Sequence, residues 1–244
     1  MTLGLLMLHA FPLDSDMWDQ QVTTLSSDTL PVVAVDLPGF GRSAQAEPEG
    51  WMDNAADHAD AALGGTGIDR VVVCGLSMGG YVALAYLRRH REKVAGLILA
   101  NTRADADDDA AKERRQGLAD RLRSEGNFLA DSPPPLLSDN ASPEVRERVS
   151  TIIRRQDPEG IARGSLAMAH RADSRGDLAG IDVPTLIITS SADSLISPDL
   201  SKEMADAIPN ARLETIEGAG HLSNLEKPDE FNTLVESFIK QIES

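Results

Sequence analysis

The stretch VVVCGLSMGG at residues 71–80 decides the fold. Its first four residues form an apolar run that is typical of a buried strand, and the segment YVALAYLRRH at 81–90 has a helical pattern. Between them, Gly-x-Ser-x-Gly predicts a sharp turn that presents Ser77 above a sheet as a nucleophile. Gly75 and Gly79 would let the backbone pass close to neighbouring elements. A glycine-rich packing turn with an incidental serine is the alternative interpretation.

Outward from this motif, short apolar runs alternate with longer helical patterns, which is typical of parallel strands joined by crossover helices. The continuous apolar character of the runs indicates strands that are covered on both faces. The predicted strands are 3–8, 31–36, 70–75, 96–100, 184–190 and 211–217, and the predicted helices lie near 15–27, 52–64, 78–91, 198–208 and 228–242. The fold class is therefore α/β, with a parallel sheet of about six strands flanked by helices.

One long segment breaks this alternation. Residues 103–175 contain no convincing strand pattern, only charged amphipathic stretches interrupted by prolines. We expect this segment to form a helical cap inserted into an α/β core made of residues 1–102 and 176–244. The acidic run at 105–109 is interpreted as a solvated helix start, since the helix dipole favours aspartate there.

Composition and charge exclude several classes of protein. The 244 residues include 23 Lys and Arg against 39 Asp and Glu, a formal charge of −16 with neutral histidines. Such acidity argues against nucleic acids and anionic membranes as partners, because binding phosphate needs clustered Lys and Arg. No apolar stretch approaches the roughly 18 residues of a transmembrane helix. With one cysteine and no zinc-like spacing, we expect a cytoplasmic protein without a metal or other cofactor.

A serine nucleophile needs a base, and the base needs a carboxylate that orients it. His221 lies in the glycine-rich loop GAGH after the last predicted strand and is the predicted base. Asp193 follows the strand at 184–190 and is the predicted acid, which fits the chain order Ser, Asp, His. The main alternative acid is Asp105, and the other competing acids are Asp182 and Asp199.

Hydrolysis by such a serine also needs two backbone N–H groups that hold the developing oxyanion. Met78 directly follows the serine, and Phe11 lies in the loop after the first predicted strand. These two residues are the predicted donors. The predicted substrate-binding side chains, which could equally be the core of the cap, are Leu136, Leu137, Met168 and His170.

Five motifs in a fixed order span nearly the whole chain outside the cap. They are LHAFPLD at 8–14, DLPGFGRS at 36–43, GLSMGG at 75–80, SSADSLISP at 190–198 and GAGHLSNLEKPDEF at 218–231. Together they resemble the α/β-hydrolase superfamily, in particular its branch of small capped serine esterases, 3-oxoadipate enol-lactonases and cofactor-free haloperoxidases. The resemblance implies a Ser-His-Asp catalytic triad, no cofactor, and a substrate specificity that depends on the cap.

The chain departs from the family pattern in two places. The His-Gly pair of the oxyanion loop is His9-Ala10 here, and this loop follows the first strand, whereas relatives usually carry two further strands before it. The resemblance therefore implies an all-parallel sheet of six strands that lacks the first two family strands, with 31–36 at an edge beside 3–8. Because exposed edge strands are usually covered or paired, a homodimer through this edge is a further hypothesis.

The expected function is that of a serine hydrolase, a carboxylesterase that cleaves a small or medium acyl ester or lactone through an acyl-enzyme. One alternative is a lactone hydrolase like 3-oxoadipate enol-lactonase, in which Arg163 or Arg171 would meet a substrate carboxylate; a solvated helix face is the other interpretation of these arginines. A second alternative is a ligand-binding receptor with little turnover. Acyltransferases and perhydrolases share the same constellation, so the natural acceptor stays open.

Overall fold

A parallel β-sheet forms the centre of the molecule. The computed structural model describes residues 1–243, and within them the sheet has six strands in the order β2-β1-β3-β4-β5-β6, each pair parallel. The strands are β1 (Leu3–Leu8), β2 (Val32–Val35), β3 (Arg70–Leu76), β4 (Val94–Ala100), β5 (Thr185–Ser190) and β6 (Ala211–Ile216). The predicted fold class and the edge position of β2 are confirmed. All carboxyl ends of the strands meet at one edge, where ligands bind in sheets of this kind.

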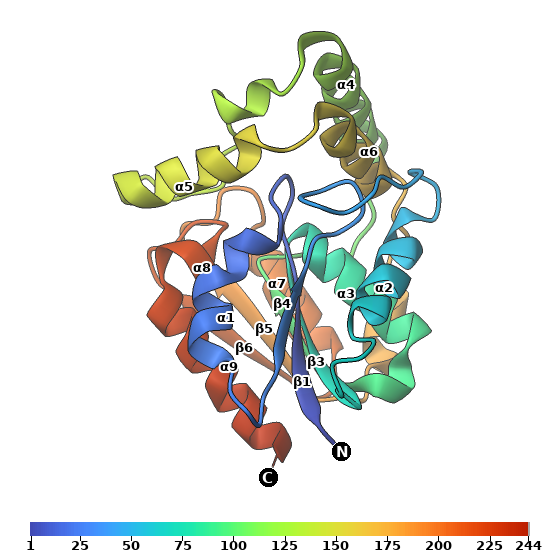
Figure 1. Cartoon of the computed structure of the whole chain (residues 1–244), viewed down its shortest axis with the longest axis vertical. Helices are drawn as coiled ribbons and strands as arrows, with labels where there is room; N and C mark the ends of the chain where they lie inside the picture. The colour runs from blue at the N-terminus through green and yellow to red at the C-terminus, as the bar shows by residue number, and fades with distance from the viewer. Residues whose placement is uncertain (244) are drawn as a thin grey trace.

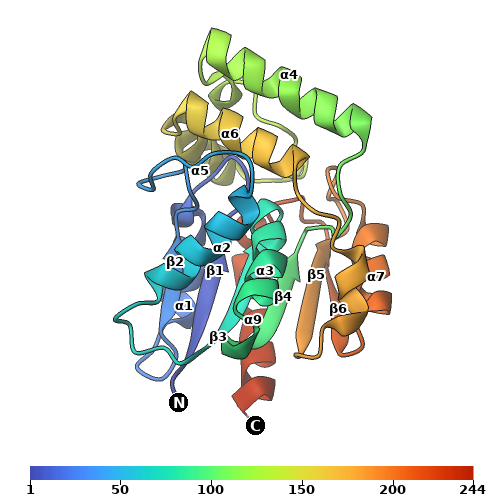
Figure 2. The ribbon, with the colours of Figure 1, turned by 90° about the vertical axis from the view of Figure 1, so that its right-hand side faces the viewer.

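Helices cover both faces of this sheet. On one face lie α2 (Trp51–Ala62), α3 (Met78–Arg89) and α7 (Pro198–Ala207), and on the other lie α1 (Asp19–Leu25) and α9 (Pro228–Glu243), as the two perpendicular views show (Figure 1 and Figure 2). The shorter helices are η1 (Ser15–Trp18), η2 (Arg91–Lys93), η3 (Phe128–Ala130), η4 (Arg175–Gly180) and α8 (Ser223–Glu226). In residues 1–243, no helix has the length and apolar character needed to cross a membrane.

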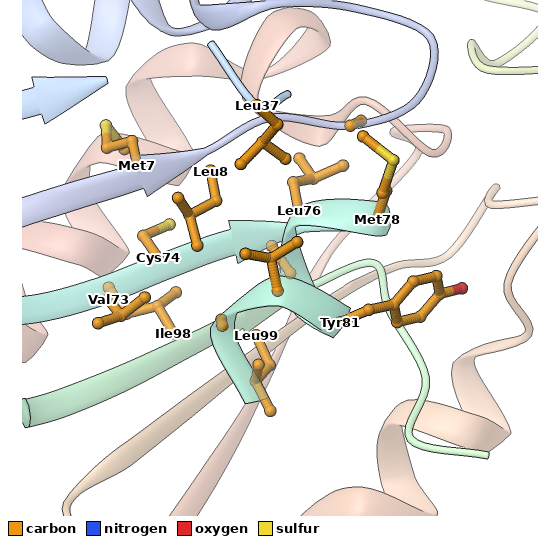
Figure 3. Close-up of a cluster of buried hydrophobic side chains, with 14 of the residues drawn as sticks. Met7, Leu8, Leu37, Val73, Cys74, Leu76, Met78, Tyr81, Ile98 and Leu99 are labelled. Carbon is orange, nitrogen blue, oxygen red and sulfur yellow. The ribbon is translucent and has the colours of Figure 1, made fainter. Parts of the chain in front are cut away.

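The core lies where β1, β3 and β4 run side by side. Figure 3 shows the apolar side chains of these strands packed together with Met78 and Tyr81 at the start of α3. Cys74 belongs to this layer and is fully buried. Burial raises the pKa of its thiol, so Cys74 is a packing residue and not a nucleophile.

Three helices lie above the carboxyl ends of the strands (Figure 1 and Figure 2). They are α4 (Asp109–Glu125), α5 (Pro143–Arg154) and α6 (Pro158–Ala169), and α4 packs along α6. All three fall within the segment 103–175 for which we expect a helical cap, and we refer to that segment as the cap. The division into a core and a cap at these residues stays a prediction.

Prolines in the cap begin two of its helices. Pro143 is the first residue of α5 and Pro158 is the first residue of α6. The fixed φ of proline suits the first turn of a helix, where its missing N–H has no partner to lose. Ser142 and Asp157 cap these helices by accepting hydrogen bonds from the N–H groups of Val145 and Glu159. These two prolines therefore define where cap helices start.

Candidate active site

The turn between β3 and α3 holds Ser77 in an unusual conformation. Its φ of 57° and ψ of −115° lie outside the regions that L-residues normally occupy. Two hydrogen bonds hold the turn: the Ser77 N–H donates to the Ala100 carbonyl at 3.0 Å, and the Thr102 hydroxyl donates to the Ser77 carbonyl at 2.8 Å. A Cβ on Gly75 would collide with the Gly79 carbonyl, which explains the glycine at that position.

His221 and Asp193 are in direct contact with each other. The His221 Nδ1 lies 2.8 Å from the Asp193 Oδ2, and both side chains are almost completely buried. Burial alone would raise the pKa of Asp193, but the hydrogen bonds and charge of His221, the Ile196 N–H and the Asn101 amide hold it below its ordinary value. An ionised carboxylate can only accept, so Nδ1 carries the proton and Nε2 is left to act as a base.

Asn101, which the sequence analysis missed, also contacts the predicted acid. Its side-chain amide donates to the Asp193 Oδ2 and to the Ser190 hydroxyl, both at 3.0 Å, while its oxygen accepts from the Ser223 hydroxyl at 2.8 Å. Asn101 has a φ of 44° and directly follows the buried strand β4. Its position as a polar residue at the carboxyl end of a central strand is the sequence feature that could have identified Asn101 as part of the site.

The contacts of the four candidate acids distinguish them from one another. Within the described residues, Asp193 alone touches His221. Asp105 is paired with Arg103, Asp182 binds Arg91 at 2.6 Å, and Asp199 is exposed in the first turn of α7.

Ser77 and His221 line one cavity of about 650 Å³ between the sheet and the cap. Phe11 reaches it from the loop after β1, and the cap contributes Leu136 and Met168, two of the predicted substrate-binding residues, to its lining. Further apolar lining comes from Leu118, Phe128, Leu129 and Pro134. Met78 is the first residue of α3, where the backbone N–H has no partner within the helix and the dipole favours negative charge.

Two residues that we expected in the pocket are not part of its lining. Leu137 is half-buried against the core, whereas the adjacent Leu136 lines the cavity. His170 is exposed at the end of α6. It lies two positions after Met168, which turns it to another side of the helix.

The two arginines considered for a substrate carboxylate are occupied elsewhere. Arg163 binds Glu47 at 2.7 Å and Glu159 at 2.9 Å. Arg171 is buried and binds Asp107 at 2.7 Å. Neither arginine lines the cavity that holds Ser77.

A glutamate joins the cap to the loop that carries His221. The Glu226 carboxylate accepts from the Ser138 N–H at 3.0 Å, from the Ser138 hydroxyl at 2.5 Å and from the Gly220 N–H at 2.9 Å. The Leu222 N–H also donates to the Leu136 carbonyl at 3.0 Å. The cap segment at 136–138 and the histidine loop are therefore held as one unit.

A buried histidine holds the loop after β1, which carries the predicted oxyanion donor Phe11. The His9 Nε2 accepts from the Leu37 N–H at 2.9 Å, and its Nδ1 donates to the Ala10 carbonyl at 3.0 Å. In this arrangement the imidazole is neutral. His9 therefore connects the loop of Phe11 to the turn that begins at Asp36.

Comparisons with known proteins find relatives that match nearly the whole chain. A 3-oxoadipate enol-lactonase of Acinetobacter baylyi is 30% identical over 236 residues, which cover 94% of this chain and 86% of that protein. A pimeloyl-(acyl-carrier protein) methyl ester esterase of Neisseria meningitidis is 30% identical over 246 residues, covering 97% of this chain and 93% of that protein.

Among solved structures, a thermophilic esterase from Thermogutta terrifontis matches with a TM-score of 0.89 and 36% identity, covering 99% of this chain and 91% of the other. The relatives are thus hydrolases of the esterase and lactonase type. Residues 5–234 match the alpha/beta hydrolase family. The chain therefore belongs to the alpha/beta hydrolase family, which is the superfamily that its five motifs resemble.

Proposed function

We propose that this protein is a serine hydrolase that cleaves carboxylic esters or lactones with small to medium acyl groups. The observation that carries the proposal is the buried Asp193–His221 hydrogen bond of 2.8 Å, beside a strained Ser77 that lines the same cavity as His221. In this role Ser77 is the nucleophile, His221 the general base and acid, and Asp193 the orienting carboxylate.

The reaction proceeds in two steps. The His221 Nε2 takes the proton of the Ser77 hydroxyl as the oxygen attacks the ester carbonyl, and the N–H groups of Met78 and Phe11 hold the oxyanion. Return of the proton to the leaving alcohol gives an acyl-enzyme. A water molecule that loses its proton to His221 then releases the acid and restores Ser77. Throughout, the Asp193 charge stabilises the imidazolium.

Cavity size and lining support a small or medium acyl group. A volume of about 650 Å³ suits a ligand of modest size, and the wall that Leu118, Leu136 and Met168 provide is apolar. The cap supplies these three residues, so we propose that residues 103–175 set the acyl specificity while residues 1–102 and 176–244 supply the chemistry.

The names of the relatives support both an esterase and a lactonase. A lactone analogous to the enol-lactone of the Acinetobacter baylyi relative would use the same three residues. Its carboxylate would need a binding group other than Arg163 and Arg171, since both are held in ion pairs.

The first experiment measures steady-state hydrolysis of p-nitrophenyl acetate, butyrate and octanoate by wild type and by Ser77→Ala. We expect sustained turnover that Ser77→Ala abolishes, with the chain-length preference reporting the size of the acyl pocket. Ser237→Ala, an exposed serine on α9, is the matched control and should retain full activity. A stoichiometric burst without turnover would favour a receptor, and equal rates for wild type and Ser77→Ala would overturn the proposal.

A further inference from the structure

One wall of the active-site cavity is basic, although the protein as a whole carries a formal charge of −16. Helix α4 presents a single face to the cavity through residues at successive helical positions i, i+3, i+4, i+7 and i+10. These residues are Ala111, Arg114, Arg115, Leu118 and Arg121. Three arginine side chains of one helix therefore line the cavity that Ser77 also lines.

Arg103, in the segment after β4, adds a fourth cavity arginine. Three of these four arginines already hold a carboxylate within residues 1–243. The pairs are Arg103 with Asp105, Arg115 with Asp107 and Arg121 with Glu125. Of the described residues, Asp107 is the one acidic side chain in the cavity wall, and it is shared between Arg115 and the buried Arg171. The group around Asp107 therefore keeps a net positive charge.

Arg114 differs from the other three. In the part of the chain that the structure describes, it makes no hydrogen bond and no ion pair, and it is an exposed residue that lines the cavity. Its five N–H donors are free, in the planar arrangement that binds a carboxylate through two parallel hydrogen bonds. A cleft of one sign in a protein of the opposite sign concentrates ligands whose charge matches the cleft.

We infer that Arg114 binds an anionic group of the substrate, and that the natural substrate is an ester or lactone whose acyl portion also bears a carboxylate. The ester lies at Ser77, the acyl chain lies along Leu118, and the carboxylate meets Arg114 at the cap. This inference rests on the proposed serine hydrolase. Arg114 is then a specificity residue, because it contacts a part of the substrate distant from the reacting bond.

The test compares charged and neutral substrates of matched length. Mono-p-nitrophenyl esters of glutaric, adipic and suberic acid are set against p-nitrophenyl pentanoate, hexanoate and octanoate. In Arg114→Gln we expect the ratio of kcat/KM for charged over neutral esters to fall about tenfold at the best chain length, since one charge-assisted contact at a partly solvated site is lost. Added sodium chloride should lower the wild-type ratio more than the variant's ratio, because only the wild type has the contact with Arg114 in addition to the remaining positive charge of the cavity wall.

Lys112→Gln is the matched control, because it removes the same charge from an exposed position on α4 that does not line the cavity. Its charged-to-neutral ratio should equal that of wild type. An equal ratio in Arg114→Gln and wild type at every chain length would overturn the inference, while turnover of the neutral esters would still support the hydrolase.

Binding supplies a readout that does not depend on turnover. Adipate, a product-like dicarboxylate, is titrated calorimetrically into Ser77→Ala and into Ser77→Ala combined with Arg114→Gln. We expect binding to weaken by about the same tenfold factor in the double variant. Equal affinities, or the absence of binding to both proteins, would contradict a carboxylate site at Arg114.

Discussion

At the scale of single residues, the proposed chemistry depends on how two side chains and two backbone N–H groups share the oxygen atoms of one carboxylate. The Asp193 Oδ2 accepts from both His221 and Asn101, while its Oδ1 accepts from the N–H groups of Leu195 and Ile196. These four contacts fix the carboxylate in one orientation. In the proposed mechanism Asn101 is therefore a positioning residue, which would act through Asp193 and not on the substrate.

Replacing Asp193 by Asn tests this arrangement. The amide keeps the shape of the side chain but provides no charge for the imidazolium and can hold His221 in the wrong tautomer. We expect kcat for p-nitrophenyl butyrate to fall on the order of 10³- to 10⁴-fold with little change in melting temperature. Asp199→Asn, an exposed aspartate on α7, should leave kcat unchanged. If Asp105→Asn abolished activity and Asp193→Asn did not, the acid would be Asp105.

At the scale of elements, the cap is fastened to the core by close backbone contact. Gly160 on α6 lies against Gly39 in the turn after β2, where a Cβ on Gly160 would collide with the Gly39 carbonyl. Arg155, just after α5, donates two hydrogen bonds to the buried Asp14, at 2.8 and 2.6 Å. Both contacts hold the cap above Ser77, so the cavity shape depends on them.

Two glycine substitutions in cap helices should have opposite effects on stability. Gly160→Ala forces α6 away from the Gly39 carbonyl, and we expect a loss of about 1 to 3 kcal/mol in the free energy of unfolding. Gly117→Ala on α4 meets open space, so it should gain about 0.5 to 1 kcal/mol from helix propensity. Urea denaturation of both variants checks this pair. If Gly160→Ala had the same urea midpoint as wild type, the stability of α6 would not depend on its contact with Gly39.

At the scale of the whole molecule, stability should depend on pH through the buried His9. Burial lowers the pKa of His9 from its ordinary 6.5, against the raising effects of the Ala10 carbonyl, Asp14 and Asp36. An imidazole with a lowered pKa contributes stability above pH 6.5, and this contribution is lost as the pH falls below 6.5, because the unfolded chain binds a proton that the folded chain does not.

Denaturant midpoints between pH 7.5 and 5 measure this effect. In wild type we expect the free energy of unfolding to fall as the pH drops below 6.5, by at most about 1.4 kcal/mol per pH unit for one proton, and His9→Gln should flatten the curve while His170→Gln, at an exposed position, should not. If the curve of His9→Gln matched that of wild type, the pH dependence could not be assigned to His9.

The Asp36 carboxyl affects stability in a separate pH range. Burial would raise the pKa of this carboxyl, but hydrogen bonds from Ser15 and Arg42 lower its pKa to about 2. The stability that the ionised carboxylate contributes is therefore lost only between about pH 4 and 2.

The edge of the sheet raises a question about assembly. Strand β2 spans only Val32–Val35 and pairs with β1 on one side, which leaves its other side as an edge of the sheet. Short edge strands are one way in which proteins avoid pairing with other chains. The homodimer through β2 stays a prediction, which a monomeric mass by light scattering would exclude.

The sequence by itself determined the class of fold, the approximate positions of the strands and of the helices outside the cap, and the turn at Ser77. These features depend on local patterns, because an apolar run, a helical period and a glycine pair act within a few residues of chain. The strand predicted at 70–75 is observed at Arg70–Leu76, and that predicted at 184–190 is observed at Thr185–Ser190. The family likewise follows from motifs that are visible in the chain.

Only the tertiary structure decided which distant groups meet. Asp193 and Asp105 both follow strands, and it is the packing of the β5 loop beneath His221 that brings one of them into contact. The cavity arginines are a second example, because the sequence does not distinguish an arginine that is paired with a carboxylate from one that is free. Partners far apart in the chain are selected by burial and by the need to satisfy every buried charge, and those conditions exist only once the chain has folded.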